Sequence, residues 1–155
     1  MCAQPYMDGK DNSGITKGLT QVLADTFVLY FKTHSFHWNV EGPHFKALHY
    51  LFEEQYTELW EATDEIAERI RALDEYGPNN FKEMLGKATL KESGQLPDEK
   101  GMLQQLEEDN RAIVDGIYSV LRTAEDAGDE ITTDMMIERA TVHEKAAWML
   151  KSLQK

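Results

Sequence analysis

Apolar residues recur with a helical period over most of the chain. In residues 15–39 they recur at Leu19, Val22, Leu23, Thr26, Phe27, Tyr30 and Phe31. Residues 43–73 repeat the spacing, with core candidates at Leu48, Leu51, Phe52, Leu59, Ile66 and Ile70. Two later stretches, 98–126 and 130–153, follow it at Leu103, Leu106, Ile113, Val114, Ile117 and Leu121, then at Ile131, Met135, Ala140, Ala147 and Leu150. The pattern predicts four long helices, and no segment reads convincingly as a strand.

Glycine and proline residues separate these helices. Gly42 and Pro43 end the first period, and Pro43 suits the first turn of the second helix. Gly128 separates the last two helices, whereas residues 74–97 form a long connection in which a short helix over 81–85 fits. We therefore expect an all-α four-helix bundle with a crossover between its second and third long helices, which is the ferritin-like arrangement. The expected domain covers residues 15–155 and follows a flexible N-terminal tail, residues 1–14.

Composition excludes several classes of protein. Cys2 is the only cysteine, so an internal disulfide and a cysteine-built metal site are both excluded. No apolar run approaches the roughly 20 residues of a membrane span. No secretory signal is visible either, and we expect a cytoplasmic protein. The net charge is −12, which disfavours contact with phosphates. Acidity favours attraction of cations, although acidic charge alone usually serves solubility.

Histidines and carboxylates supply the candidate chemistry. Four of the five histidines lie within residues 34–49, and Asp64 and Glu68 follow one helical turn apart. Imidazole and carboxylate together suit iron and its first-row neighbours. Measured around the helix from His49, Glu53 lies at about 40°, Asp64 at about 60° and Glu68 at about 100°. All four side chains are therefore predicted to project from one side of one helix.

Distance along that helix separates the candidate ligands into two groups. The pair His49 and Glu53 is about 22 Å from the pair Asp64 and Glu68, which is too far for one metal centre. An antiparallel copy of the helix, related by a two-fold axis near Glu58, would bring one pair beside the partner's other pair. The turn at 40–43 would fold the end of the first helix back, so that a histidine there joins the site. The hypothesis is an inter-subunit centre made of His37, His49 and Glu53 from one chain and Asp64 and Glu68 from its neighbour.

The residues alone leave plainer interpretations open. A histidine on a helix is more often a surface or core group than a ligand, and paired acids more often form a solvated face. The only Glu-x-x-His match, Glu41 to His44, crosses a helix-breaking turn, so a conventional ferritin-type di-iron motif is not expected. His143-Glu144 begins like a zincin motif, but Ala147 replaces the second histidine. For His143 we favour a capped or interface histidine.

Three segments resemble a known family. They are residues 33–45, which read THSFHWNVEGPHF, the spaced pairs His49/Glu53 and Asp64/Glu68, and residues 143–150, which read HEKAAWML. Together they resemble the Dps family of mini-ferritins. The resemblance implies a homododecameric hollow shell that oxidises Fe(II), preferentially with hydrogen peroxide, at two-fold interfaces and stores ferric mineral.

The family pattern also implies roles for particular residues. His37, His49 and Glu53 match the iron ligands from one subunit, and Asp64 and Glu68 match those from the other. Glu53 stands where many relatives have aspartate, so we expect altered geometry but not loss of the site. Trp38 matches the aromatic neighbour of the centre, which intercepts oxidising equivalents; its alternative role is packing.

Two other functions stay open beside a ferroxidase that stores iron and protects against oxidative stress. The first is a nucleoid-associated, DNA-protecting protein of the same family. Such proteins commonly use terminal arms rich in lysine and arginine, and this acidic chain departs from that pattern, so we expect DNA binding to be absent or weak. The second is a shell that binds another metal, such as zinc or manganese.

Because ligating histidines must be neutral, metal binding should weaken as the pH falls.

Overall fold

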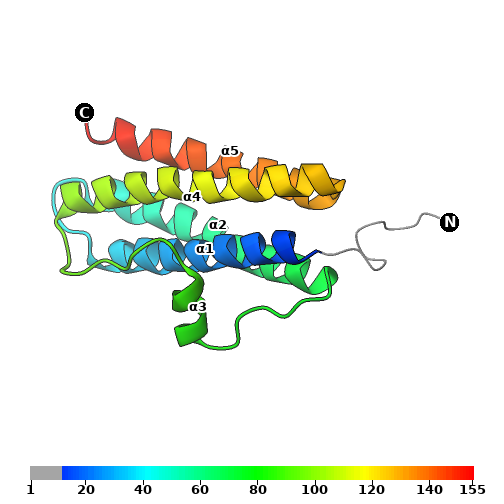
Figure 1. The fold of residues 1–155 in the computed structure, drawn as a ribbon. Helices are drawn as coiled ribbons and strands as arrows, with labels where there is room; N and C mark the ends of the chain where they lie inside the picture. Colours follow the sequence, from blue (N-terminus) through cyan, green and yellow to red (C-terminus); the bar gives the residue numbers. More distant parts are fainter. Residues whose placement is uncertain (1–11) are drawn as a thin grey trace.

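The computed structural model describes residues 12–155 and confirms the ferritin-like four-helix bundle. The long helices are α1 (Ser13–Asn39), α2 (Phe45–Ala72), α4 (Glu99–Ala127) and α5 (Glu130–Ser152). A short helix, α3 (Phe81–Lys87), interrupts the crossover between α2 and α4 (Figure 1). No strand occurs among the described residues, as the periodicity predicted.

The long helices pack side by side, with α1 against both α2 and α4 and with α4 against α5 (Figure 1). The short α3 lies outside the bundle beside α1 and has no buried residue. Within the described part of the chain, no helix is both long and apolar enough to cross a bilayer.

Most helix ends lie within two residues of the prediction, and α3 extends to Lys87, two residues beyond the predicted 81–85. Helix α1 begins at Ser13, two residues early, while residues 1–11 of the predicted tail lie outside the described range. The prediction that Pro43 occupies the first turn of the second helix is wrong, because α2 begins only at Phe45. Pro43 instead follows Gly42 in a tight turn, in which the Phe45 N–H donates to the Gly42 carbonyl over 3.1 Å. The fixed φ of proline suits this second position of a turn.

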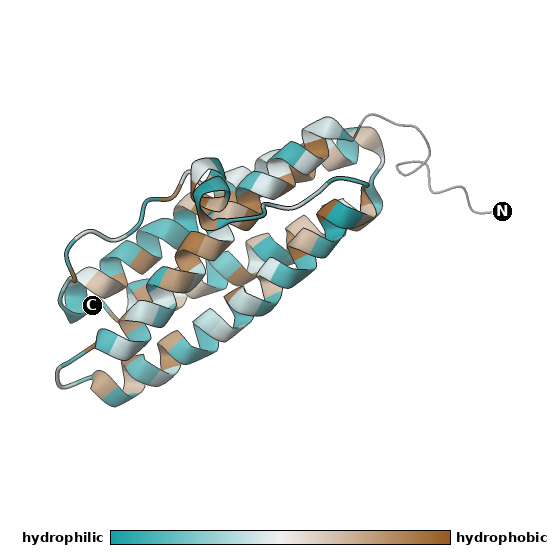
Figure 2. Cartoon of the chain, turned by 90° about the horizontal axis from the view of Figure 1, so that it is seen from below, coloured by the Kyte–Doolittle hydropathy of each residue, from teal (hydrophilic) through white to brown (hydrophobic). Residues whose placement is uncertain are grey.

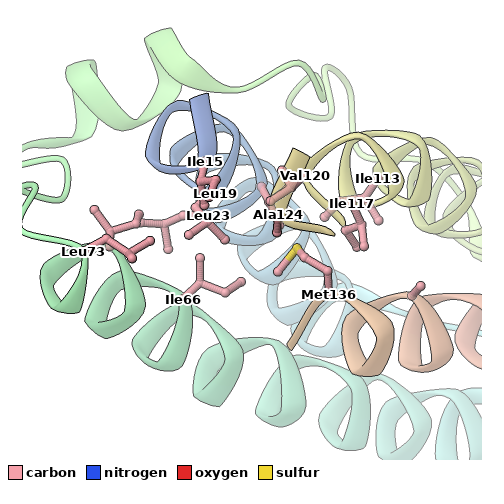
Figure 3. Packing of buried hydrophobic residues seen from close by; sticks show 13 residues of the cluster. Ile15, Leu19, Leu23, Ile66, Leu73, Ile113, Ile117, Val120, Ala124 and Met136 are labelled. Atoms are coloured by element: carbon pink, nitrogen blue, oxygen red, sulfur yellow. The ribbon is translucent and has the colours of Figure 1, made fainter. Parts of the chain in front are cut away.

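Two apolar clusters fill the space between the helices. The first joins all four long helices at one end through residues such as Leu19, Ile66, Ile117 and Met136 (Figure 3). The second fills the end near the α1–α2 turn, around Phe36, Leu48, Phe52, Leu103, Leu106 and Leu150. Hydrophilic and hydrophobic segments are interspersed along the helices in Figure 2, and the one-sided pattern is clearest in α2 and α4. The predicted core positions of α2 are buried except Leu51, which is partly exposed.

Buried charged groups hold the crossover against α1. The Asp25 carboxylate accepts hydrogen bonds from the Thr89 N–H and hydroxyl, each over 2.6 Å, and from the Leu90 N–H over 2.9 Å. Lys32 donates to the Lys91 carbonyl over 2.7 Å and to Asp109 over 2.6 Å. Since charge-assisted hydrogen bonds are the stronger kind, these contacts anchor the crossover together with Leu90, which packs against both apolar clusters.

Candidate metal centre

The α1–α2 turn brings His37 and His49 into contact. His37 lies in the last turn of α1 and His49 near the start of α2. The buried Val40 donates its N–H to the Phe36 carbonyl and ends α1, after which the chain reverses within a few residues. The two imidazole rings stack, with their centroids 3.8 Å apart and their planes 16° from parallel. The predicted association of these two histidines is therefore present within a single chain.

Each of the two imidazoles is oriented by the backbone of the other residue. Nδ1 of His37 lies 2.6 Å from the carbonyl oxygen of His49, and Nδ1 of His49 lies 2.7 Å from the carbonyl oxygen of His37. A carbonyl oxygen only accepts, so each Nδ1 must carry the proton and donate it. With the proton on Nδ1, the uncharged form of each ring has its lone pair on Nε2, and neither Nε2 has a partner among the described residues. In a metal-ligating histidine, one ring nitrogen usually donates to a carbonyl or carboxylate while the other binds the metal. His37 and His49 have the first of these bonds and leave Nε2 available for the second.

The three candidate carboxylates do not meet this histidine pair within one chain. Glu53 lies one helical turn beyond His49 and is exposed. Asp64 and Glu68, also exposed, lie a further three to four turns along α2, about 22 Å from the His49 end. Accordingly, residues 12–155 of a single chain contain no group of three histidine, cysteine or acidic side chains placed to hold a metal. The histidine pair therefore lies near the start of α2, and the Asp64/Glu68 pair lies toward its other end.

Aromatic rings lie beside the histidine pair at the α1–α2 turn. Phe45 stacks on His49 with a centroid distance of 5.0 Å. Trp38 is 57% exposed, and its ring centroid lies 4.5 Å from that of His34. Large aromatic side chains seldom stay exposed in such a group unless a partner covers them.

The other two histidines of the cluster have different surroundings. Nδ1 of His44 lies 2.5 Å from a Glu99 carboxylate oxygen at an exposed position. His34 is partly buried, and its Nδ1 lies 2.9 Å from the Tyr30 hydroxyl. Burial lowers the pKa of His34, and the neighbouring His37 lowers it further. Neither histidine joins the stacked pair, as expected for a surface group and a neighbour of the centre.

Sequence reasoning missed an extended group of stacked rings beside the centre. His34 stacks on Tyr56 at 3.7 Å with an interplanar angle of 11°, and Tyr30 lies 5.1 Å from Trp60. The pairs Tyr30/His34 and Tyr56/Trp60 each have a four-residue spacing, which places two rings on the same face of a helix. This spacing was the available signal, but it resembles that of ordinary core aromatics.

His143 lies inside the bundle between α4 and α5, which agrees with an interface histidine. Its Nδ1 lies 2.8 Å from Asn110 Oδ1, and an Arg139 nitrogen lies 3.1 Å from its Nε2. Arg139 also makes a two-point ion pair with Glu58 on α2. Burial, followed by the charge of Arg139, lowers the pKa of His143 to about 3. A neutral histidine beside a guanidinium is therefore a structural group and not a candidate metal ligand.

This fold defines a ferritin-like protein. The chain matches the ferritin-like domain family over residues 16–155. It is 36% identical to the DNA protection during starvation protein 2 of Bacillus anthracis over 91% of this chain and 97% of that protein. The chain therefore belongs to the Dps family.

Solved structures agree with this assignment. Dps from Staphylococcus aureus superposes with a TM-score of 0.88 at 35% identity, covering 91% of this chain and 95% of the other. Antigen TpF1 from Treponema pallidum superposes with a TM-score of 0.90 at 30% identity, covering 96% of each. Members of the Dps family are ferroxidases that bind iron and are typically dodecameric.

Proposed function

We propose that this protein is a cytoplasmic ferroxidase and iron-storage shell that oxidises Fe(II), preferably with hydrogen peroxide, and thereby protects against oxidative stress. The observation that carries the proposal is the stacked pair of His37 and His49, in which both Nε2 lone pairs are free. Imidazole nitrogen combined with carboxylate oxygen is a donor set suited to Fe(II). Assembly as a homododecamer would supply the two-fold interfaces at which the site forms.

The proposed centre combines residues of two subunits. His37, His49 and Glu53 of one chain would meet Asp64 and Glu68 of its partner if two α2 helices pack antiparallel. The carbonyl oxygens that accept from each Nδ1 hold the rings and make Nε2 a better donor. Three carboxylates, with a total charge of −3, would offset most of the charge of two bound Fe(II) ions. Two Fe(II) ions then reduce one hydrogen peroxide with two protons, giving two Fe(III) ions and two water molecules.

Trp38 is the proposed interceptor of oxidising equivalents near the centre. Its indole is exposed, directly follows His37 in α1 and lies beside His34, which supports access to species formed at the centre. A packing role at the subunit interface is the alternative. Trp38→Phe would retain packing but increase radical release if the indole acts as the interceptor.

Replacing the distant carboxylates tests the proposal. In Asp64→Asn/Glu68→Gln the shape of each side chain is kept while its charge is removed. We expect peroxide-dependent Fe(II) oxidation, followed by stopped-flow absorbance, to lose its rapid phase while the shell stays assembled. Glu61→Gln/Glu65→Gln is the matched control, because these two acids are also exposed on α2 and have the same four-residue spacing. Wild-type rates in the Asp64/Glu68 variant would overturn the assignment.

Mixing chains tests whether the centre lies between subunits. One variant lacks the histidines, His37→Ala/His49→Ala, and the other lacks the acids, Asp64→Asn/Glu68→Gln. A mixed dimer has one intact centre, so random co-assembly should restore about a quarter of the wild-type centres. No recovery in verified mixed shells would contradict an inter-subunit site.

DNA protection is the second candidate, favoured by the names of relatives such as those from Bacillus anthracis and Porphyromonas gingivalis. The net charge of −12 opposes it, because phosphate contacts require a local excess of lysine and arginine. A low-salt gel shift without divalent cations should show little retardation, and tight retardation would favour the second function.

Anaerobic Fe(II) titration in competition with zinc tests whether iron is the metal.

A further inference from the structure

A continuous series of rings runs along the α1–α2 face away from the histidine pair. The centroid of Tyr56 lies 5.2 Å from that of His37 and 3.7 Å from that of His34. Tyr30 follows, 5.5 Å from His34 and 6.3 Å from Tyr56. Trp60 continues the series 5.1 Å from Tyr30. Adjacent rings are thus in contact or close to it along the whole series.

The two ends of this series lie at the two halves of the proposed centre. At one end, Tyr56 faces the imidazole of His37 edge-on. At the other end, Trp60 lies one helical turn before Asp64, and both residues line the same surface cavity. If the proposed function is correct, each subunit therefore connects the centre holding its own histidines with the centre holding its own acids.

Within this series, Tyr30 has a defined proton acceptor. Its hydroxyl lies 2.9 Å from Nδ1 of His34, and no other partner of this hydroxyl occurs among the described residues. A phenol that loses an electron must also lose its proton. A hydrogen-bonded imidazole can hold that proton and return it, so Tyr30 is suited to reversible one-electron oxidation.

We propose that Tyr56, His34, Tyr30 and Trp60 carry single electrons between the two Fe(II)-oxidising centres of a dimer, with Tyr30 as the radical intermediate. The inference rests on the proposed function and gives these rings a role in it. Peroxide requires two electrons, and a centre that holds a single Fe(II) supplies only one. The second electron would come from Fe(II) at the other centre through these rings.

The steps balance. Fe(II) at one centre and hydrogen peroxide give Fe(III), hydroxide and a hydroxyl radical equivalent. The radical equivalent takes an electron from Tyr30 and becomes hydroxide, while the phenol proton moves to His34. Fe(II) at the other centre then reduces the Tyr30 radical through Trp60, His34 returns the proton, and two solvent protons convert the hydroxides to water. The sum is two Fe(II), one peroxide and two protons giving two Fe(III) and two water molecules.

The test uses the assembled shell loaded anaerobically with one Fe(II) per centre and mixed with hydrogen peroxide. Freeze-quenched electron paramagnetic resonance should detect a tyrosyl radical that narrows with ring-deuterated tyrosine and is lost in Tyr30→Phe. Tyr30→Phe should also release severalfold more spin-trapped hydroxyl radical and consume nearly one peroxide per Fe(II), against one per two in the wild type. Tyr118→Phe, on the exposed side of α4, is the control and should behave as wild type.

Trp60→Phe separates a relay from a simple radical trap. If Trp60 passes the electron from the distant centre, the Tyr30 radical should form in this variant but decay more slowly. An equal radical lifetime in Trp60→Phe, or wild-type stoichiometry in Tyr30→Phe, would overturn the relay. If the wild-type shell itself failed to oxidise Fe(II) with peroxide, the proposed function would fail instead, so the two failures are distinguishable.

Discussion

His143 should make the stability of this protein depend on pH in the weakly acidic range. The Asn110 amide donates its own hydrogen to the Leu106 carbonyl over 2.8 Å, so its oxygen faces His143 and accepts from Nδ1. Arg139 donates to Nε2, which must therefore carry a lone pair. Protonating Nε2 would make its N–H face the Arg139 N–H, and it would place the imidazolium charge beside the guanidinium charge inside the bundle. The folded chain thus retains the neutral ring where the unfolded chain binds a proton.

The size of the effect follows from the lowered pKa. The pKa of His143 is about 3 in the folded chain, against 6.5 for an exposed histidine. Between pH 3 and 6.5, His143 binds a proton in the unfolded chain but not in the folded chain. The contribution of the neutral His143 to the free energy of unfolding is therefore fully present above pH 6.5 and is lost as the pH falls toward 3. At pH 5.5, one unit below the unfolded pKa, the loss is about 1.4 kcal/mol per chain.

His143→Gln isolates this contribution, because an uncharged amide can still donate to Asn110 and accept from Arg139. Urea unfolding of wild type and variant is compared at pH 7.5 and 5.5, at one protein concentration because assembly affects apparent stability. The free energy of unfolding of the wild type should fall by about 1.4 kcal/mol more than that of the variant. An equal fall in both proteins would refute the assignment of a neutral buried His143.

Two further changes test how the turn and the crossover are held. Gly42 has a φ of +119°, and an added Cβ would lie 2.9 Å from a Glu99 carboxylate oxygen, so Gly42→Ala should cost about 1–3 kcal/mol in unfolding free energy. Because the turn positions His37 beside His49, Gly42→Ala should also weaken Fe(II) binding measured by titration calorimetry. A variant as stable as the wild type would show that the turn is unstrained. Asp25→Ala removes the buried acceptor of the partly buried Thr89 and Leu90 N–H donors and should cost about 1–3 kcal/mol. Their amides should then exchange hydrogen faster, and unchanged exchange would contradict the proposed anchoring.

Periodic apolar positions were sufficient to predict the helices and the crossover, because burying one face of each helix decides this fold. Pro43 was misplaced since its fixed φ suits both a first helical turn and the second position of a tight turn. Spacing predicted that His37 and His49 would approach each other. The reciprocal bonds from each Nδ1 could not be predicted, because they depend on the path of the turn backbone. The stacking of Tyr56 on His34 was missed for a related reason, as it requires the relative rotation of two helices.

The bundle interior explains why iron chemistry in this chain requires a subunit interface. A ferritin-type bundle places carboxylates and histidines inward from facing helices to hold its metal. Here the middle of the bundle contains a neutral His143 and a guanidinium, that of Arg139, whose charge is paired with Glu58. An Fe(II) ion placed there would meet the positive charge of Arg139 and would have to compete with it for the Glu58 carboxylate. The stacked His37 and His49 instead lie at the α1–α2 turn, next to the exposed Phe45, where the proposed second chain would add acids. Iron binding should therefore require assembly, so an isolated chain that kept its fold would bind Fe(II) only weakly.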